Sequence, residues 1–435
     1  MKVSLFQGIL YGVFILAALI GLFVFSTYTS KNTGSNSIGP VVIWGTLPRE
    51  DMTATLNTLG QTQVGLKSVT YKEKDAATLP TDLAAAIATG DAPDLVLASQ
   101  EQLHTLAKFI TPVPVATLPA NIFESTFVEE GKMLAAPGGG YYGIPFLIDP
   151  LVLFVNRSIL SSSGIARPPS TWEALTGLVS NIAQLTPTRQ VTRGLIGLGT
   201  YDNVRNARGI LSTIFLQTSI PLSTYSPSGV TTADLGGASA SGGQPSGRSV
   251  LAFYTQFADP SKVSYTWNAS LQDSQRMFLA GNLALYLGYA SEARFMTAAN
   301  PNLNFGVSPV PQPATAATKN VYGLLYSLMM PRGAKNASGA LQAATILINA
   351  ASQATAAVNT GLAPATLAQL SVRPPDPIAA VAYAEALYAH GWLSPMPAST
   401  DALFSGMITS VIIGRLSTQA ALISTEQALT ALLQQ

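Results

Sequence analysis

The side chains that carry out most enzymatic chemistry are scarce in this sequence. It contains two histidines, His104 and His390, and no cysteine, which removes disulfides, thiolate nucleophiles and sulfur-ligated metals from consideration. The HExxH metal motif, the GxSxG nucleophile motif, the Walker phosphate loop and the Rossmann glycine pattern are missing. A pair of glycosidase carboxylates stays open, because such residues meet only in the folded chain. The sequence therefore favours a binding protein over an enzyme, and predicts no cofactor and no metal site.

Short apolar segments and a helical pattern alternate after residue 40. Residues 41–45, 66–74 and 94–99 are predicted strands, and residues 79–90 have helical spacing that ends in glycine. Strands as apolar as these argue for a parallel α/β sheet with both faces covered. A chain of 435 residues exceeds the usual size of a single core, so we expect two lobes with a cleft between them.

The charge pattern argues against nucleic acid as a partner. Charged residues make up 10% of the chain, and 23 basic and 22 acidic side chains leave a net charge of +1. The basic residues are scattered singly and form no stripe, whereas nucleic-acid binding needs a clustered positive surface.

The N-terminal segment is predicted to hold the chain at a membrane. Leu5–Tyr28 carries no charge, and its length suffices to cross the roughly 30 Å hydrocarbon layer as a helix. Residues 24–28 make a poor cleavage site, so within residues 1–28 we favour an uncleaved anchor over a cleaved signal peptide. Residues 29–40 are rich in Ser, Thr, Asn and Gly, which predicts a flexible linker.

Two later segments have a clear local composition. Residues 226–249 are dense in Gly and Ser, so we expect an exposed loop there, either disordered or at the rim of the cleft. Residues 402–435 return to helical spacing.

Three segments carry a resemblance to a known family. Residues 79–99 read as a helix, Gly-Asp-x-Pro-Asp and an apolar strand. Residues 141–182 contain Tyr-Gly-x-Pro, a strand, and Pro-x-Thr-Trp-x-Glu-Leu at a helix start. Residues 278–313 contain Phe-x-x-Gly and end in Asn-Phe-Gly-x-x-Pro-x-Pro. In this order they resemble the bacterial extracellular solute-binding proteins of ABC importers, of the carbohydrate, maltose-binding-protein-like type, and residues 323–365 resemble the strand and helix pair that follow.

The resemblance implies a two-lobed periplasmic-binding-protein fold of type II, also called a Venus flytrap, with three hinge crossings. Lobe 1 would comprise residues 41–148 and 322–370, and lobe 2 residues 149–321 and 371–435. The implied partners are a small solute and the permease of an ABC transporter. Relatives commonly carry a lipid on a cysteine that this chain lacks, and a single-pass membrane helix with an extracytoplasmic binding domain would do the same work.

Sugar binding would need aromatic faces and planar polar groups in the cleft, and ligands of open α/β sheets lie beyond the carboxyl ends of strands. The residues of these types at expected strand ends or crossings are Trp44, Glu50, Gln100, Asp149, Tyr201, Asn203, Trp267, Asn268, Tyr289 and Tyr322. We expect Trp267 to be the main stacking aromatic. Asp149 is either a ligand group or a hydrogen-bonding group of the hinge, and Trp44 and the tyrosines have core packing as an alternative. We expect Trp172 to pack in the core, and Asp94 to shape a turn.

Two other functions stay open. A membrane-tethered solute sensor for a signalling receptor would use the same fold and site. A surface glycosidase would need two carboxylates about 5 to 10 Å apart in the cleft. Which sugar, polyol or peptide-like solute binds is not determined by the residue types.

Overall fold

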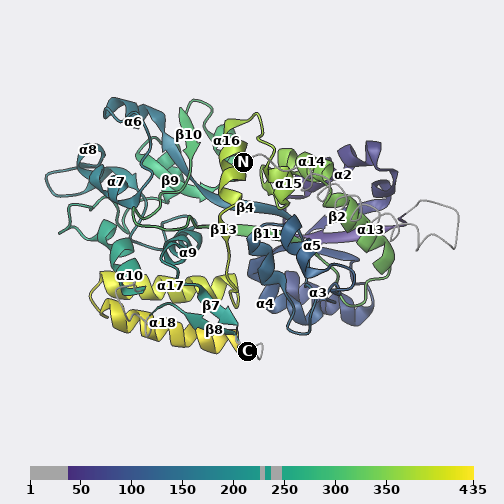
Figure 1. Ribbon diagram of the computed structural model, residues 1–435. Coiled ribbons are helices and arrows are strands. Elements are labelled where there is room, and N and C mark those ends of the chain that lie inside the picture. The colour runs from purple at the N-terminus through teal and green to yellow at the C-terminus, as the bar shows by residue number, and fades with distance from the viewer. Residues whose placement is uncertain (1–37, 226–230, 237–246) are drawn as a thin grey trace, which may run out of the picture.

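The computed structural model describes residues 38–225, 231–236 and 247–435. Within them, eleven strands join into one sheet that runs through both halves of the molecule (Figure 1). The main path of the sheet is, in spatial order, β2 (Val69–Glu73), β1 (Val41–Gly45), β3 (Leu95–Ser99), β11 (Val321–Met329), β4 (Ile144–Asn156), β9 (Leu283–Tyr289), β6 (Val191–Ile196) and β5 (Gln184–Leu185). We call the half that holds β1, β2 and β3 lobe 1, and the half that holds β5, β6 and β9 lobe 2.

Lobe 1 confirms the three predicted strands, except that residues 66–68 of the second belong to a short 3-10 helix and its strand begins at Val69. β1 pairs in parallel with both β2 and β3, and β3 is buried along its whole length. Helices cover both faces, as expected for strands without a polar side. The helical elements of this lobe are α2 (Arg49–Thr62), η2 (Val64–Ser68), α3 (Leu79–Thr89), η3 (Gln100–Gln102), α4 (Leu103–Leu106), η4 (Ala107–Phe109), α5 (Ala120–Thr126), η5 (Glu129–Leu134), α13 (Ala337–Leu347), α14 (Ala350–Thr360) and α15 (Leu367–Leu370).

The Gly-Asp-x-Pro-Asp segment has the structural role that we predicted. Gly90 ends α3 in the left-handed conformation, with φ at 75°, where glycine has no steric penalty. The carboxylate of Asp94 accepts a hydrogen bond from the backbone N–H of Val42 at 2.9 Å and one from that of Asn336 at 2.8 Å. Asp94 thereby ties β3 to β1 and to the start of α13.

Strands β4 and β11 cross from one lobe to the other. All thirteen residues of β4 are buried, and its neighbours change near Pro150. Gly323 of β11 is the partner of Pro150, whereas Leu151 is already paired with Tyr289 of β9. Proline has no N–H to donate, so it is tolerated where a strand changes neighbours.

The centre of the sheet corrects the expectation of a purely parallel sheet. β3, β11, β4 and β9 are antiparallel neighbours. The physical reason is that β4 leaves lobe 1 and β11 returns to it, so the two crossing strands run in opposite directions. The parallel pairs lie on either side of this centre.

Lobe 2 surrounds the parallel pair of β6 and β9. Trp172 is buried there, and its indole N–H donates to the side-chain oxygen of Gln217 at 2.6 Å, which confirms its predicted packing role. The other elements of this lobe are α6 (Arg157–Ser162), α7 (Trp172–Gly177), α8 (Val179–Ile182), α9 (Ala207–Gln217), β7 (Leu222–Tyr225), β8 (Thr231–Asp234), α10 (Gly247–Thr255), η6 (Gln256–Ala258), α11 (Ser274–Leu279), α12 (Glu292–Ala299), β10 (Phe305–Ser308), α17 (Pro397–Ile412) and α18 (Thr418–Leu433).

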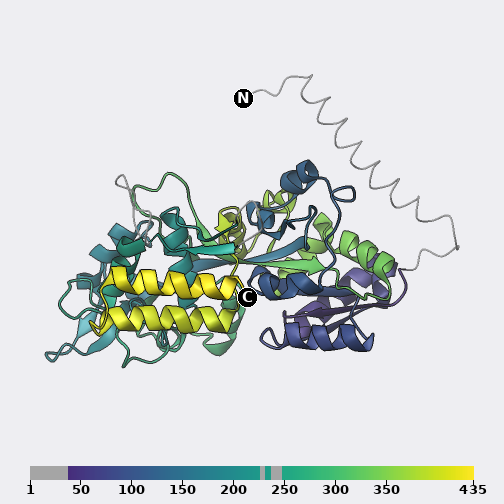
Figure 2. The same cartoon turned by 90° about the horizontal axis from the view of Figure 1, so that it is seen from below.

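Part of the predicted Gly/Ser-rich loop is a strand. β8 lies inside residues 226–249 and forms an antiparallel hairpin with β7. The backbone N–H of Ala233 donates to the hydroxyl of Thr430 at 3.0 Å, so α18 holds the hairpin against the lobe. Residues 226–230 and 237–246 of that loop lie outside the described residues. The helical spacing predicted for the C-terminal segment is confirmed by α17 and α18, which lie side by side (Figures 1 and 2).

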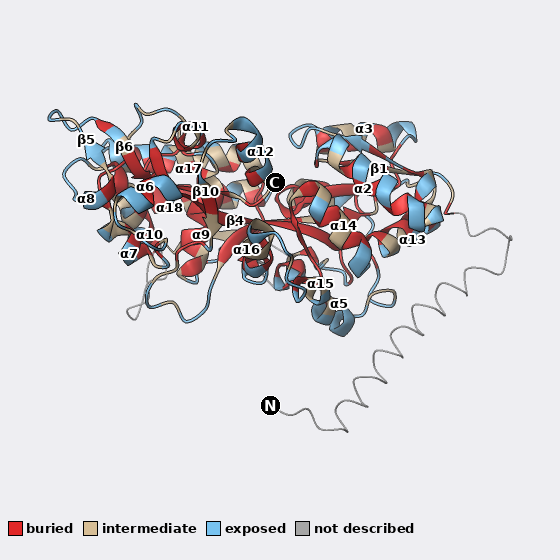
Figure 3. Ribbon diagram, turned by 90° about the horizontal axis from the view of Figure 1, so that it is seen from above, coloured by how far each residue is buried: buried red, intermediate tan, exposed pale blue. Residues whose placement is uncertain are grey.

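The chain after α15 lies at the junction of the lobes. β12 (Ala363–Pro364) pairs with the lobe 1 part of β4, α16 (Pro377–Ala386) packs on β4, β10 and β12, and β13 (Ala389–His390) pairs in parallel with β11. After β13 the chain enters lobe 2. Burial is complete along β4, and seven of the nine residues of β11 are buried (Figure 3). The two lobes therefore share one apolar core.

The predicted membrane anchor, Leu5–Tyr28, lies outside the described residues. Among the helices of the described part, none is both long enough and apolar enough to cross a membrane.

Candidate functional site

The carboxyl ends of parallel strands from the two lobes point toward the junction. β3 ends at Ser99 and leads into η3, which carries Gln100 and Glu101. β6 ends at Ile196 and leads to a loop that carries Tyr201 and then to α9, whose second residue is Arg208. The crossing strands β4 and β11 lie between them. The fold thus brings the strand ends of both lobes to one place, as the general rule for open α/β sheets predicts.

Five side chains from both lobes form a connected polar network, which we call the interlobe cluster. Glu101 of lobe 1 accepts from Nε of Arg208 at 3.0 Å and from Nη2 at 2.8 Å. It also accepts from the hydroxyl of Tyr322 at 2.6 Å. In lobe 2, Nη1 of Arg208 donates to Asp401 at 2.6 Å, and the Tyr201 hydroxyl donates to the same carboxylate at 2.6 Å. The cluster therefore presents two carboxylates, two phenols and one guanidinium at the junction.

Burial and neighbouring charges determine the protonation of the cluster. Burial acts to lower the pKa of Arg208, but the adjacent Glu101, Tyr322 and Asp401 together outweigh it, and the net pKa is raised. The guanidinium therefore stays charged. Burial raises the pKa of Tyr201 and of Tyr322, and the nearby carboxylates add to both shifts. The two phenols are thus held as hydrogen-bond donors.

Gln100 stabilises the crossing strand. Its side-chain amide nitrogen donates to the carbonyl of Gly323 at 2.8 Å, and its oxygen accepts from the backbone N–H of Leu325 at 2.7 Å. The residue is fully buried. Both ends of the amide are therefore used on β11, so the structure assigns Gln100 to the hinge and gives it no free group for a ligand.

Asp149 and Tyr289 lie at the lobe 2 side of the crossing. Asp149 is buried in β4 and accepts from the backbone N–H and the hydroxyl of Ser291. Burial raises its pKa to about 7, despite these two hydrogen bonds. Tyr289 ends β9 half-buried, and its hydroxyl lies so close to α9 that a Cβ on Gly209 would come within 2.7 Å of it. Tyr289 thus reaches the helix that carries Arg208.

Trp267 does not have the stacking role that we expected. Its ring is completely buried, and its indole N–H donates to the side-chain oxygen of Asn203 at 3.2 Å. Asn203 also donates to the carbonyl of Asn268 at 2.9 Å, and the Asn268 amide donates to the hydroxyl of Tyr265 at 2.8 Å. Stacking requires an open face, so these three predicted site residues form a packed support inside lobe 2.

Trp44 and Glu50 do not belong to the interlobe cluster. Trp44 is half-buried in β1, and the ammonium of Lys74 lies 4.0 Å from the centre of its ring, a cation–π distance. Glu50 is exposed in the first turn of α2, where the positive end of the helix dipole stabilises a carboxylate. Each of these residues has a structural explanation at its own place.

Sequence reasoning missed the charged members of the cluster. Glu101, Arg208 and Asp401 were not among the residues selected from the sequence. Arg208 lies 107 residues from Glu101 and 193 residues from Asp401, so no local spacing connects them. The usable indication was the rarity of charge, since Arg208 is the one charged residue of α9.

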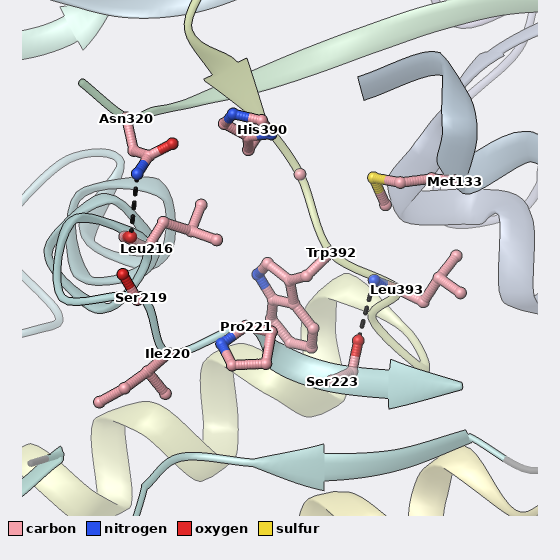
Figure 4. A pocket seen from close by; sticks show the side chains of 11 residues that line it. Met133, Leu216, Ser219, Ile220, Pro221, Ser223, Asn320, His390, Trp392 and Leu393 are labelled. Atoms are coloured by element: carbon pink, nitrogen blue, oxygen red, sulfur yellow. Dashed lines mark hydrogen bonds between the residues drawn. The ribbon is translucent and has the colours of Figure 1, made fainter. Parts of the chain in front are cut away.

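A pocket of about 340 Å³ lies beside the chain segment that leaves β13 (Figure 4). Met133 of lobe 1 lines one wall, and Leu216 at the end of α9 lines another. Between them lies Trp392, whose indole N–H donates to the hydroxyl of Ser212 at 2.9 Å. Because both lobes contribute walls, the shape of this pocket depends on how the lobes are oriented.

No metal centre is found in the part of the chain that the structure describes. In residues 38–225, 231–236 and 247–435, no group of three or more histidine, aspartate or glutamate side chains is placed to hold a metal ion. The interlobe cluster instead consists of hydrogen-bonding groups suited to a polar solute.

Several solved structures have the same two-lobed arrangement. The GacH receptor of Streptomyces glaucescens, described unliganded and with acarbose, has 16% identity and a TM-score of 0.69, and the match covers 92% of this chain and 99% of the other. The cyclic α-maltosyl-1,6-maltose binding protein of Arthrobacter globiformis has 18% identity and a TM-score of 0.71, with 91% and 100% covered. A cyclo/maltodextrin-binding protein complexed with maltotetraose has 15% identity and a TM-score of 0.71, with 92% and 98% covered. At these identities the likeness establishes the fold.

The sequence itself identifies the family. No curated protein sequence matches the chain. The family model for the bacterial extracellular solute-binding proteins, however, matches residues 56–384, which include the interlobe residues Glu101, Arg208 and Tyr322. Together with the two-lobed α/β fold, this match shows that the chain belongs to the bacterial extracellular solute-binding protein family.

Proposed function

We propose that this protein captures a hydroxyl-rich solute, a sugar or an oligosaccharide, between its lobes and presents it to the permease of an ABC importer. The observation that carries the proposal is the interlobe cluster, in which Glu101 of lobe 1 faces Arg208, Asp401 and Tyr201 of lobe 2. Carboxylates, phenols and a guanidinium are the groups that bind sugar hydroxyls. The ligands of two structural neighbours, acarbose and maltotetraose, support the same class of solute.

The balance of charge in the cluster favours an uncharged solute. Arg208 is bound by both Glu101 and Asp401, so its positive charge is already compensated. An anionic solute would meet two carboxylates and no free cation of the cluster. A neutral sugar can donate its hydroxyls to the carboxylates and to the phenol oxygens without adding charge.

The mechanism that follows from the fold is a change in the angle between the lobes. A solute that contacts both lobes stabilises the closed form, because it binds that form more tightly than the open one. The closed form then docks on the permease. We infer no covalent step, since the cluster carboxylates Glu101 and Asp401 are both bound to Arg208 and neither is placed as the free acid that a glycosidase requires.

The proposed location is the extracytoplasmic side of the cell membrane. Leu5–Tyr28 is uncharged and long enough to serve as a single-pass anchor. Such a tether keeps the binding domain near its permease and raises the effective concentration of the two partners.

A thermal-shift screen tests the proposed solute class. The full-length chain in mild detergent would be heated with sugars, oligosaccharides, polyols and amino acids, with tryptophan fluorescence as the readout. A solute that binds only the folded state stabilises it and so raises the melting temperature. At a solute concentration of a hundred times Kd the stabilisation is about 2.7 kcal/mol. We expect a shift with at least one sugar or oligosaccharide.

Two matched variants locate the site. Asp401→Asn removes a carboxylate of the cluster, and Asp91→Asn removes an exposed carboxylate that pairs with Lys335 within lobe 1. We expect the sugar-induced shift to be lost in the first variant and kept in the second. A shift with amino acids alone, or equal shifts in both variants, contradicts the proposed solute class or site.

A further inference from the structure

Among the described residues, two ion pairs connect the lobes directly. Arg208 on α9 pairs with Glu101 at 2.8 Å. At a second place, Arg294 on α12 of lobe 2 pairs with Asp51 on α2 of lobe 1 at 3.0 Å, and the same guanidinium donates to the carbonyl of Asn359 on α14. Each contact joins residues that would separate if the lobes moved apart.

The pair of Arg208 and Glu101 has the geometry of a strong contact. Two guanidinium nitrogens face the two carboxylate oxygens at 3.0 and 2.8 Å, a bidentate arrangement. The side chains are only 16% and 7% exposed. Water and salt therefore screen this pair less than they screen a surface pair.

Both partners are held in position from their own sides. In lobe 2, Arg208 also donates to Asp401 at 2.6 Å and to the carbonyl of Pro397 at 3.1 Å. On the other side, the hydroxyl of Tyr322 on the crossing strand orients Glu101 at 2.6 Å. Of the contacts around Arg208 and Glu101 named here, opening the lobes breaks the one between these two residues. Each partner therefore keeps its orientation, and the contact can form again without a rearrangement of the side chains.

We propose that Arg208 and Glu101 form an ionic latch that closes the lobes before any solute arrives, and that Arg294 and Asp51 form a weaker second latch. This inference rests on the lobe movement of the proposed function. The second latch is weaker because Arg294 is 55% exposed, which lets solvent and salt compete for it. A solute then shifts an existing equilibrium toward closure and does not create the closed form.

The absence of cysteine allows a direct measurement of lobe closure. The chain contains no cysteine, so two introduced cysteines can be labelled without side reactions. Val64 of lobe 1 is 70% exposed and Val263 of lobe 2 is 91% exposed, which makes both positions suitable for dyes. Single-molecule energy transfer would be recorded on the full-length, solute-free chain in mild detergent.

We expect the solute-free chain to show a closed population of high transfer efficiency. Arg208→Gln should lower the ratio of closed to open molecules about tenfold, since a charge-assisted bidentate contact is lost. Glu101→Gln serves as a second variant, because it removes the charge and keeps a partner for Tyr322. Raising the salt concentration should open the Arg294→Gln variant less than the parent chain, because the exposed pair is the one that salt screens.

A matched ion pair within one lobe provides the control. Lys335 pairs with Asp91 at 3.2 Å, and both lie in lobe 1. Lys335→Gln removes this pair and should leave the transfer efficiency unchanged. A general effect of losing a charge would instead change all the variants alike.

The proposal is overturned if the solute-free chain is only open, or if Arg208→Gln and Glu101→Gln keep the closed population of the parent while remaining folded. These results are independent of the sugar screen. If a sugar raises the melting temperature but the solute-free chain has no closed population, the proposed function is kept and the latch is discarded. If the solute-free chain is closed but no sugar raises the melting temperature, the latch is kept and the proposed function is discarded.

Discussion

The two oxygens of Asp149 accept hydrogen bonds from one residue, Ser291, whose backbone N–H lies 3.1 Å and whose hydroxyl lies 2.5 Å away. The carboxyl is buried in the strand that crosses between the lobes. Desolvation outweighs the two hydrogen bonds and raises its pKa from 3.8 to about 7. The fold therefore favours the neutral form of Asp149 near the hinge.

The first prediction concerns the pH dependence of stability. Because the folded pKa of Asp149 is raised from 3.8 to about 7, the folded chain keeps a proton that the unfolded chain releases in that window. Stability should then fall as the pH rises from about 4 to 7, by a few kcal/mol for a shift of this size. Between pH 5 and pH 8, the melting temperature of the Asp149→Asn variant should fall less than that of the parent.

A background slope of the same sign should persist in that variant. Burial raises the pKa of Glu385 on α16 to about 7 as well. Its contribution to folding stability therefore decreases over the same pH range. Adding Glu385→Gln should flatten the profile further. Equal pH profiles for the parent and Asp149→Asn would show that Asp149 is ionised in the fold.

The second prediction concerns Glu130 at the junction of the lobes. It is 1% exposed, and within the described part of the chain neither of its oxygens has a hydrogen-bond partner. Burial, and then the charge of Glu101, raise its pKa well above the usual value. Glu130→Met keeps the length of the side chain and removes the desolvated carboxyl, so we expect about 1–3 kcal/mol more stability at pH 7.5.

The melting temperature checks this prediction, and Glu130→Gln separates its causes. Glutamine removes the titration but keeps a buried polar group, so it should flatten the pH profile with a smaller gain. If Glu130→Met melts below the parent, the carboxyl has a stabilising partner after all.

The third prediction concerns two glycines. A Cβ on Gly391, just after β13, would lie 2.5 Å from an oxygen of Glu130 and 2.8 Å from the amide nitrogen of Gln100. Both neighbours are buried, so Gly391→Ala should cost about 1–3 kcal/mol. Gly406 lies in α17 with nothing within 4 Å of its would-be Cβ, and Gly406→Ala should add about 0.5–1 kcal/mol.

Thermal melting of both glycine variants provides the test. The cost of Gly391→Ala should shrink in a Glu130→Ala background, because one of the crowding atoms is then gone. Equal costs in the two backgrounds would place the strain elsewhere.

The fourth prediction separates two of the aromatic candidates, Trp267 and Tyr289. Trp267 is fully buried and donates to Asn203, so Trp267→Phe should lower the melting temperature and leave the affinity for solute unchanged. Tyr289 is half-buried beside the helix of Arg208, so Tyr289→Ala should weaken solute binding by more than about tenfold, the effect of losing roughly 1.4 kcal/mol of contact. Titration calorimetry with a solute found by the thermal screen measures both affinities. A loss of affinity in Trp267→Phe with none in Tyr289→Ala would reverse the assignment.

Local patterns allowed correct predictions where the physical cause is local. The strands of lobe 1, the turn at Asp94 and the packing of Trp172 follow from apolar periodicity, glycine conformation and a capped helix start. Whether an aromatic residue at the end of a segment is buried depends on distant segments. Trp267 is covered by parts of lobe 2 that include the loop of Asn203, 64 residues away, and its spacing gives no indication of this.

The charged contacts of the candidate site were beyond local reasoning for a similar reason. Arg208 meets Asp401 across 193 residues, and one residue type at one position does not indicate its partner. Tyr201 and Tyr322 were selected because they were expected at a strand end and at a crossing, and the structure places both in the interlobe cluster. Position along a strand was thus informative, whereas pairing between distant segments was not.

The pairing of β3 with β11 also constrains the order of folding during synthesis. Ser99 lies beside Tyr326 and Val96 beside Met329, so the edge of β3 has no partner until the chain has been made as far as residue 329. Such long-range pairing is slow, and an unpaired apolar strand edge promotes aggregation in the meantime. We therefore expect the nascent chain to need a chaperone, or delivery across the membrane in an unfolded state, before its first lobe can be completed.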